Sequence, residues 1–267
     1  MITKPRKVSI VIPSFNQANY INETLACLVH QQDITKKQLE IIVIDGGSTD
    51  GTLAIIERYA AQLDYVVSEP DRGQTHALIK GFAQATGDVL GWLCSDDLLE
   101  ETTICEVLDY FESHSTAQFV YGDVLWIDQH SHVLRHGKEI SFNWFIWIYG
   151  GNYIPQPATF WRRELYEQVG GLDEQYNLAM DADLWSRFAQ CTQPQHVRRT
   201  WARVRLHPER KTQRMYDRTK AEDRRIRERL GASFHDSSSY GRLYVRMRNF
   251  YARGLRIVWK FITGGYL

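Results

Sequence analysis

The first half of the chain alternates short apolar runs rich in β-branched residues with longer segments whose apolar positions recur every three or four residues. The short runs predict strands at residues 8–12, 39–44, 65–68, 88–94 and 119–123. The longer segments predict helices at residues 21–31, 52–63, 75–85 and 101–114. Strands that alternate with helices are typical of βαβ units. We therefore expect an α/β fold with a mostly parallel, Rossmann-like central sheet flanked by helices.

The second half of the chain has a less regular pattern. It predicts a strand pair at 124–136, a loop-rich aromatic wall at 141–161, and helices near 163–169 and 181–189. The composition changes after Thr212, where a densely charged helix through 220–229 precedes a basic and aromatic tail. We therefore expect one domain over residues 1–212 and a helical C-terminal appendage over residues 213–267.

The tail has no acidic residue between 237 and 267, whereas six Lys and Arg residues alternate there with aromatic and aliphatic ones. This composition predicts a helix or helix pair that binds the anionic inner leaflet of a membrane as a peripheral contact. The alternative is an ordinary helix packed on the core or against a second subunit.

Composition limits the class of protein. The 267 residues carry 32 Lys and Arg against 32 Asp and Glu, so the chain is not a globally basic nucleic-acid binder and we expect no nucleic acid as partner. The four cysteines form no C-x-x-C pair, which predicts reduced thiols rather than a zinc site or a disulfide framework. The N-terminus lacks the apolar stretch of a signal peptide, so a cytoplasmic location is expected.

Acidic residues follow the predicted strands. Asp45 follows the second strand, Glu69 and Asp71 follow the third, and Asp96 and Asp97 follow the fourth. Ligands of open parallel sheets bind at the carboxyl ends of the strands, where these carboxylates would converge and repel one another. Mg²⁺ or Mn²⁺ bound together with a sugar nucleotide would relieve that repulsion.

A series of motifs in this order resembles the family 2 glycosyltransferases, which are inverting enzymes of the GT-A fold. The motifs are VSIVIPSFN at 8–16, IVIDGGSTDGT at 42–52, EPDRGQTHALIKGFAQATG at 69–87, GWLCSDD at 91–97, the segment 156–185 and RLH at 205–207. The resemblance spans about residues 7 to 212. Two positions depart from the family pattern: Cys94 replaces the first acid of the D-x-D-type motif, and Ile79 stands where Asn is common.

The resemblance implies roles for individual residues. Pro13, Phe15 and Asn16 would line the nucleotide pocket, Asp45 would accept a hydrogen bond from the base, Asp96 would reach the ribose, Asp97 would bind the metal, and His207 would join the metal or the diphosphate. Arg72, beside Asp71, is a candidate for the diphosphate, although a surface ion pair explains it equally well.

Asp181 falls at the position of the family's catalytic base. Met180 and Leu184 are apolar at i and i+4, which predicts that one helix face is buried and that Asp181, in the first turn, points toward the cleft. Asp183 is two positions further along and therefore about 200° away around the helix, so only one of the two can face the cleft.

The expected reaction moves a sugar from a UDP- or dTDP-linked donor to a saccharide or lipid-linked acceptor, in the synthesis of surface polysaccharide or lipopolysaccharide. Single displacement would invert the anomeric centre. A nicotinamide-dependent oxidoreductase would need G-x-G-x-x-G after the first strand, where this chain has Pro-Ser-Phe-Asn. A sugar-nucleotide pyrophosphorylase and an inactive homologue that only binds nucleotide sugar or glycan remain as alternatives, and Cys94 is the feature that favours the inactive homologue.

Overall fold

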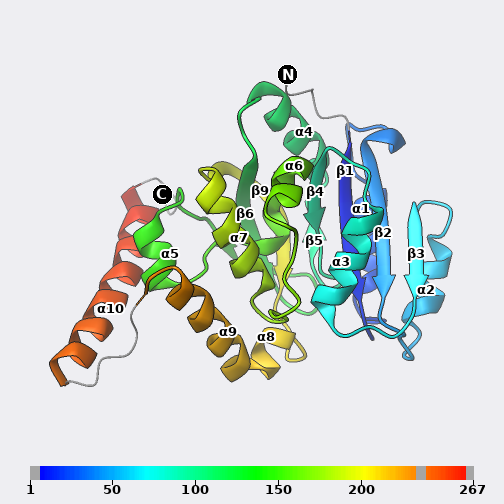
Figure 1. Ribbon diagram of the computed structural model, residues 1–267. Helices are drawn as coiled ribbons and strands as arrows, with labels where there is room; N and C mark the ends of the chain where they lie inside the picture. Colours follow the sequence, from blue (N-terminus) through cyan, green and yellow to red (C-terminus); the bar gives the residue numbers. More distant parts are fainter. Residues whose placement is uncertain (1–6, 233–238, 263–267) are drawn as a thin grey trace.

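The computed structural model describes residues 7–232 and 239–262, and it consists of a curled sheet with helices on both faces (Figure 1). The strands are β1 (Val8–Ser14), β2 (Leu39–Asp45), β3 (Tyr65–Ser68), β4 (Val89–Trp92), β5 (Leu98–Leu99), β6 (Phe119–Ile127), β7 (Val133–Gly137), β8 (Thr159–Arg162) and β9 (Gln195–Arg205). They follow the order β3-β2-β1-β4-β8-β6-β9-β5, and β7 pairs with β6. The expected α/β fold is confirmed.

The sheet has a parallel half and a mixed half. β3, β2, β1 and β4 pair in parallel, β8 lies antiparallel between β4 and β6, and β9 runs parallel to β6. Alternate residues of β1 enter different cores: Val8, Ile10 and Ile12 pack on one face and Val11 on the other. Burial on both faces explains why this strand is a nearly continuous apolar run.

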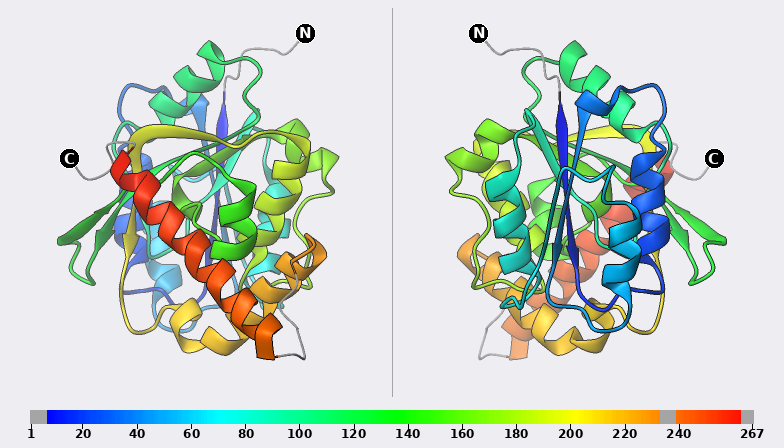
Figure 2. Two further views of the ribbon diagram at one scale, coloured as in Figure 1. Left: turned by 90° about the vertical axis from the view of Figure 1, so that its left-hand side faces the viewer. Right: turned by 90° about the vertical axis from the view of Figure 1, so that its right-hand side faces the viewer.

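Ten α-helices lie within the described residues, and Figure 2 shows them on both sides of the sheet. They are α1 (Ile21–Val29), α2 (Thr52–Arg58), α3 (Gln74–Gln84), α4 (Thr103–Ser113), α5 (Trp144–Gly150), α6 (Arg163–Gln168), α7 (Met180–Cys191), α8 (Lys211–Arg214), α9 (Tyr216–Arg229) and α10 (Ser239–Ile262). None of the described helices is both long and apolar enough to cross a membrane.

The helix α5 and the strands β8 and β9 differ from the sequence prediction. The aromatic stretch 141–161 contains the helix α5, because the Asn143 side chain accepts a hydrogen bond from Ile146 N at 3.0 Å and caps it. The strand β9 was not predicted, since its sequence QHVRRTWARVR lacks a continuous apolar run. Two of its charged residues are stabilised by ion pairs, Arg203 with Glu100 and Arg205 with Glu23.

The C-terminal helices contact the preceding domain. Ile226 of α9 is buried in the same core as α7, and α10 packs along α5. Residues 233–238 lie outside the described part of the chain. The division at residue 212 stays a prediction.

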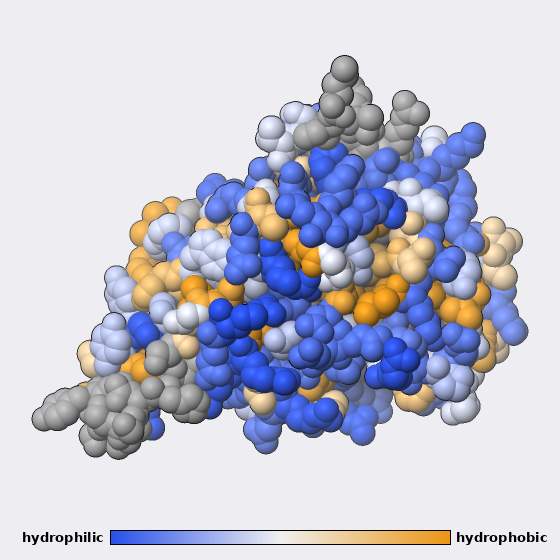
Figure 3. Space-filling view, viewed as in Figure 1, coloured by the Kyte–Doolittle hydropathy of each residue, from blue (hydrophilic) through white to orange (hydrophobic). Residues whose placement is uncertain are grey.

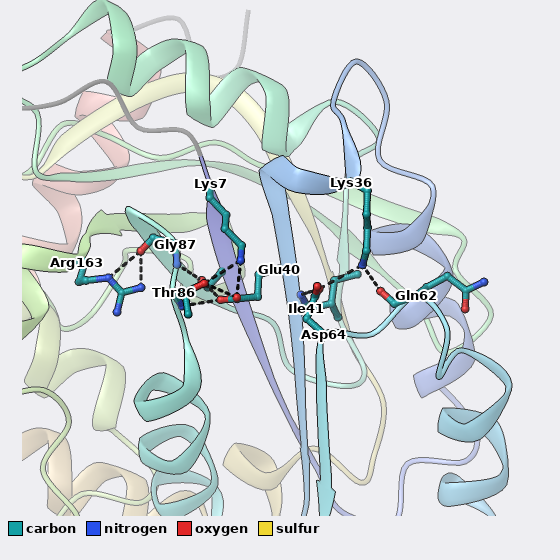
Figure 4. A network of polar contacts seen from close by, with 10 residues as sticks. Lys7, Lys36, Glu40, Ile41, Gln62, Asp64, Thr86, Gly87 and Arg163 are labelled. Carbon is teal, nitrogen blue, oxygen red and sulfur yellow. Dashed lines mark hydrogen bonds and ion pairs between the residues drawn. The ribbon is translucent and has the colours of Figure 1, made fainter.

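A buried carboxylate ties β1, β2 and the end of α3 together (Figure 4). Glu40 of β2 accepts hydrogen bonds from Lys7 Nζ at 2.6 Å, Ser9 Oγ at 2.5 Å, and the Thr86 hydroxyl and amide at 2.5 and 2.7 Å. Burial raises the pKa of Glu40, but these hydrogen bonds, first of all that from Lys7, lower it more, to about 2. The ionised carboxylate therefore stabilises the fold.

We predict that Glu40→Gln lowers the free energy of unfolding by about 2 kcal/mol at pH 7, because one charged acceptor of several hydrogen bonds is lost. A lowered native pKa gives stability that is present above the unfolded pKa of about 4.5 and disappears as the pH falls toward about 2. Urea unfolding of the wild type and of Glu40→Gln should show that the difference in their free energies of unfolding narrows as the pH falls over that range. A difference that is constant with pH would contradict the assignment.

Candidate active site

A cleft of about 1110 Å³ opens beside the carboxyl ends of β1 and β4, large enough for a sugar nucleotide and part of an acceptor. Six of the predicted residues line it: Pro13, Phe15, Asn16, Asp96, Asp97 and Asp181. Asp45, Arg72 and His207 are not among the lining residues. The cleft therefore brings together most of the residues that the sequence predicted.

The loop after β1 forms one wall of the cleft. Asn16 has a φ of +52°, a conformation that is uncommon for a residue other than glycine. Two hydrogen bonds hold it there, from its own amide to Ser48 Oγ at 2.8 Å and from Thr49 N to its Oδ1 at 2.9 Å. The neighbouring Phe15 ring is 58% exposed within the cleft. An exposed aromatic ring on a fixed loop is suited to stacking on a nucleotide base.

Asp45 lies beneath this wall and is fully buried. It accepts hydrogen bonds from Gly47 N at 3.0 Å, Ser48 N at 2.8 Å, Ser48 Oγ at 2.5 Å and Ser68 Oγ at 2.7 Å. These contacts make Asp45 the support of the loop that holds Asn16. Its predicted hydrogen bond to the base stays a prediction.

Asp71 reaches the cleft on the same side, although the sequence singled it out only as one of the converging acids. A Cβ atom at Gly46 would lie 2.8 Å from Asp71 Oδ2 and 3.3 Å from the Phe15 ring. A side chain at position 46 would displace the Asp71 carboxylate from this position beside the Phe15 ring. Because Asp71 and Phe15 line the cleft together, Asp71 is a further candidate for contact with the base.

Arg72, in contrast, points away from the cleft. Its guanidinium pairs with Glu174 at 2.7 Å, both side chains are exposed, and it lines a separate pocket of about 200 Å³. The structure thus places Arg72 in a surface ion pair, which was the alternative interpretation to a diphosphate contact.

Two adjacent carboxylates follow β4. Ligand atoms of Cys94, Asp96 and Asp97 lie within 4.8 Å of one another. Burial, and then the charge of Asp96, raise the pKa of Asp97 well above its usual range, despite the hydrogen bond from Arg205 N at 2.9 Å. Burial and the two acids also raise the pKa of the Cys94 thiol, which therefore stays protonated.

The donor chemistry at this point fits a divalent cation. Two carboxylates supply the hard oxygen ligands that Mg²⁺ and Mn²⁺ prefer, and a cation between them would remove the repulsion that raises the pKa of Asp97. A protonated thiol is a poor ligand for these ions. Asp96 and Asp97 are therefore the residues of this group that could hold the metal.

His207 is placed behind Asp96 rather than in the cleft. Its Nε2 lies 2.8 Å from Asp96 Oδ2, and its ring packs 4.6 Å from that of Tyr20. Its Nδ1 is buried and has no hydrogen-bond partner among the described residues. In this position it orients one carboxylate of the pair. Its predicted direct contact with metal or diphosphate stays a prediction.

Cations from the segment after β9 close the other side of the cleft. Arg210, Lys211 and Arg214 line it, and Lys211 Nζ donates to Asn177 O at 2.7 Å. Burial lowers the pKa of Lys211. The sequence analysis did not single out these residues, although three cations within positions 210–214, shortly after RLH, were a visible signal. They are suited to a diphosphate lying against Asp96 and Asp97.

Asp181 lies in the first turn of α7 and lines the same cleft. Burial raises its pKa to about 6, and its carboxylate accepts a hydrogen bond from Asn152 Nδ2 at 2.8 Å. Asp183 is turned away and fully paired, with Arg187 at 2.6 Å and Arg229 at 2.5 Å. Among the residues that the structure describes, Asp183 pairs with two arginines, whereas Asp181 forms no ion pair and is available to accept a proton.

The loop that leads into α7 is anchored by the C-terminal segment. Glu222 of α9 is buried and accepts hydrogen bonds from the amides of Asn177, Leu178 and Ala179 at 3.1, 2.8 and 3.0 Å. These bonds fix the backbone immediately before Asp181. The position of the candidate base therefore depends on α9.

Comparisons with known proteins agree with this site. The family model "Glycosyl transferase family 2" matches residues 9–170. The PGL/p-HBAD biosynthesis glycosyltransferase of Mycobacterium bovis (strain BCG / Pasteur 1173P2) is 30% identical over 207 residues, which cover 71% of this chain and 73% of that protein. An uncharacterized glycosyltransferase of Mycobacterium tuberculosis (strain CDC 1551 / Oshkosh) is 27% identical over 198 residues, or 74% of each chain.

Solved structures share the fold at lower identity. S. aureus TarS 1–349 in complex with UDP-GlcNAc is 19% identical with a TM-score of 0.62, over 75% of this chain and 59% of that one. The mannosyltransferase PcManGT from Pyrobaculum calidifontis, in complex with GDP-Man and Mn²⁺, is 18% identical with a TM-score of 0.64, over 99% and 76%. These neighbours confirm the GT-A fold. The family model and the mycobacterial relative show that the chain belongs to the family 2 glycosyltransferases.

Proposed function

We propose that the protein is an inverting glycosyltransferase that moves a sugar from a UDP- or dTDP-linked donor to a hydroxyl of a saccharide or lipid-linked acceptor. The observation that carries this proposal is the shared cleft, in which Asp181 and the Asp96–Asp97 pair line one space beside the exposed Phe15 ring. Neighbours of the same fold bind UDP-GlcNAc, or GDP-Man with Mn²⁺. A cytoplasmic enzyme of surface polysaccharide or lipopolysaccharide synthesis would use such substrates.

The proposed reaction is a single displacement. Asp181 accepts the proton of the acceptor hydroxyl as its oxygen bonds to the anomeric carbon. The bond from that carbon to the donor phosphate breaks, and its electron pair leaves with the nucleoside diphosphate. Mg²⁺ or Mn²⁺ held by Asp96 and Asp97 would supply charge neutralisation for this leaving group. Arg210 and Lys211 stand where they would bind the same diphosphate. Attack opposite the leaving group inverts the anomeric centre.

We predict that transfer requires a divalent cation bound through Asp97. Removal of metal with EDTA should abolish turnover, and Mn²⁺ alone should bind the wild type in a calorimetric titration. Asp97→Ala should lose Mn²⁺ binding and metal-linked donor binding, because a carboxylate ligand is removed. His207→Ala should be milder, since its ring contacts Asp96 from behind. Full transfer by EDTA-treated enzyme, or a larger defect in His207→Ala, would contradict this assignment.

We predict that Asp181→Asn lowers transfer by about 10²–10⁴-fold while donor affinity stays near normal, because the amide keeps the shape but cannot accept the proton. In the wild type, kcat/KM should fall as the pH drops below about 6, the pKa of the base. Because the pKa of Asp181 is raised in the folded protein, its charged form destabilises the fold at pH values above that pKa. The neutral Asp181→Asn variant should therefore be at least as stable as the wild type at pH 8.

Two comparisons decide the assignment of the base. Asp173→Asn, on the loop before α7, is the matched control and should transfer sugar nearly normally. Asp183→Asn should lower thermal stability instead, because it leaves Arg187 and Arg229 without their charged partner. Near-normal transfer by Asp181→Asn would remove it as the base. A wild type that binds donor and releases no nucleoside diphosphate with any acceptor would favour the inactive homologue suggested by Cys94.

A further inference from the structure

The helix α10 has an unusual distribution of side chains. Leu243, Met247, Phe250, Ile257 and Phe261 recur at a spacing of three, four or seven and form one stripe along the helix. All five side chains are more than half exposed, and Phe250 reaches 80%. Tyr244, Tyr251, Val258 and Ile262 widen the exposed stripe on one side. We call these nine side chains the apolar face of α10.

The opposite side of α10 faces the protein and is partly polar. Ala252 is fully buried and packs near Gly150 of α5. Arg256 and Lys260 follow Ala252 at intervals of four residues, so they lie on the same side of the helix. Both bind the Glu139 carboxylate at 2.7 Å. Ion pairs to this largely buried carboxylate fix the rotation of the helix, so the outward direction of the apolar face is set by the fold.

The surface at this end of the molecule is correspondingly apolar. Figure 2 shows α10 running across the outside of the structure, and Figure 3 shows orange, hydrophobic surface at the end formed by α5 and α10. A soluble monomer rarely exposes so many large apolar side chains along one helix. This arrangement indicates that another surface covers the apolar face.

The charges beside the apolar face identify what covers it. Arg246 and Arg253 are exposed along one edge of the face, and no acidic residue occurs between 237 and 267. In a second copy of the same helix packed against this one, these cations would meet no acidic partner on α10. Anionic lipid headgroups supply the complementary charge, and tyrosine and tryptophan are the residues that favour the bilayer interface.

We propose that α10 is an interfacial membrane helix that lies in the plane of an anionic bilayer, with its apolar face among the acyl chains and Arg246 and Arg253 at the headgroup phosphates. The same helix carries Arg256 and Lys260 into the wall of the cleft that holds Asp181. The cleft thus opens beside the lipid surface. Resting on the proposed function, this placement assigns the acceptor to the lipid-linked class, with its anchor in the membrane.

Vesicle flotation of the full chain tests this inference. We expect binding to vesicles of phosphatidylethanolamine with about one third phosphatidylglycerol and much weaker binding to pure phosphatidylcholine. Phe250→Glu/Ile257→Glu should weaken binding at least about tenfold, because two inserted apolar side chains are replaced by charges. Val133→Glu/Leu134→Glu is the matched control, since both side chains are exposed at 52% and 54% on β7, and it should bind like the wild type.

Specific results would overturn the proposal. One is equal binding of the wild type to neutral and anionic vesicles, and another is an equal loss of vesicle binding in the β7 control. A third is a wild type that binds no vesicles but forms a dimer in light scattering, which Phe250→Glu/Ile257→Glu dissociates. Thermal unfolding should be unchanged in both double variants, because the altered side chains are exposed. Vesicle binding needs neither donor nor turnover, so Asp181→Asn should still bind. Wild-type binding without any sugar transfer would contradict the proposed function and leave this inference standing.

Discussion

Two adjacent carboxylates held in a largely buried position at the end of β4 are the constraint on which the rest of the site depends. Like charges this close destabilise one another unless a cation or hydrogen-bond donors surround them. The fold supplies part of this compensation from residues more than a hundred positions later: Arg205 N donates to Asp97, the Arg205 guanidinium donates to the Asp96 carbonyl, and His207 contacts the Asp96 side chain. The parallel pairing of β9 with β6 places Arg205 beside this pair.

The sequence predicted the parallel half of the sheet because β1, β2 and β4 are buried along their whole length and are therefore mostly apolar. It also predicted the acids that follow β4, since residues after parallel strands meet at one edge. β9 escaped prediction because its stability comes from pairing with β6 and from distant ion pairs, which leave no local pattern. The sequence left the direction of Arg72 open for the same reason, because its partner Glu174 is 102 positions away.

The first turn of α7 shows how environment gives two carboxylates on one helix different properties. Asp183 is buried with two arginines and remains a structural ion pair. Among the described residues Asp181 receives hydrogen bonds but no ion pair, so burial raises its pKa toward the range where a base is useful. Sequence spacing predicted that the two would diverge. The spacing could not predict that Asn152 donates a hydrogen bond to Asp181, nor that Arg229 of α9 pairs with Asp183.

The chemistry of the site crosses the boundary predicted at residue 212. Glu222 fixes the backbone before Asp181, and Arg256 and Lys260 line the cleft from α10. A helix that only covered the core would direct its apolar side inward, whereas α10 directs polar groups toward Glu139 and apolar groups outward. The ion pairs to Glu139, together with the packing of Ala252 and Leu255 against the protein, hold the inner side in place. The same contacts that complete the cleft therefore also set the face that α10 presents to its surroundings.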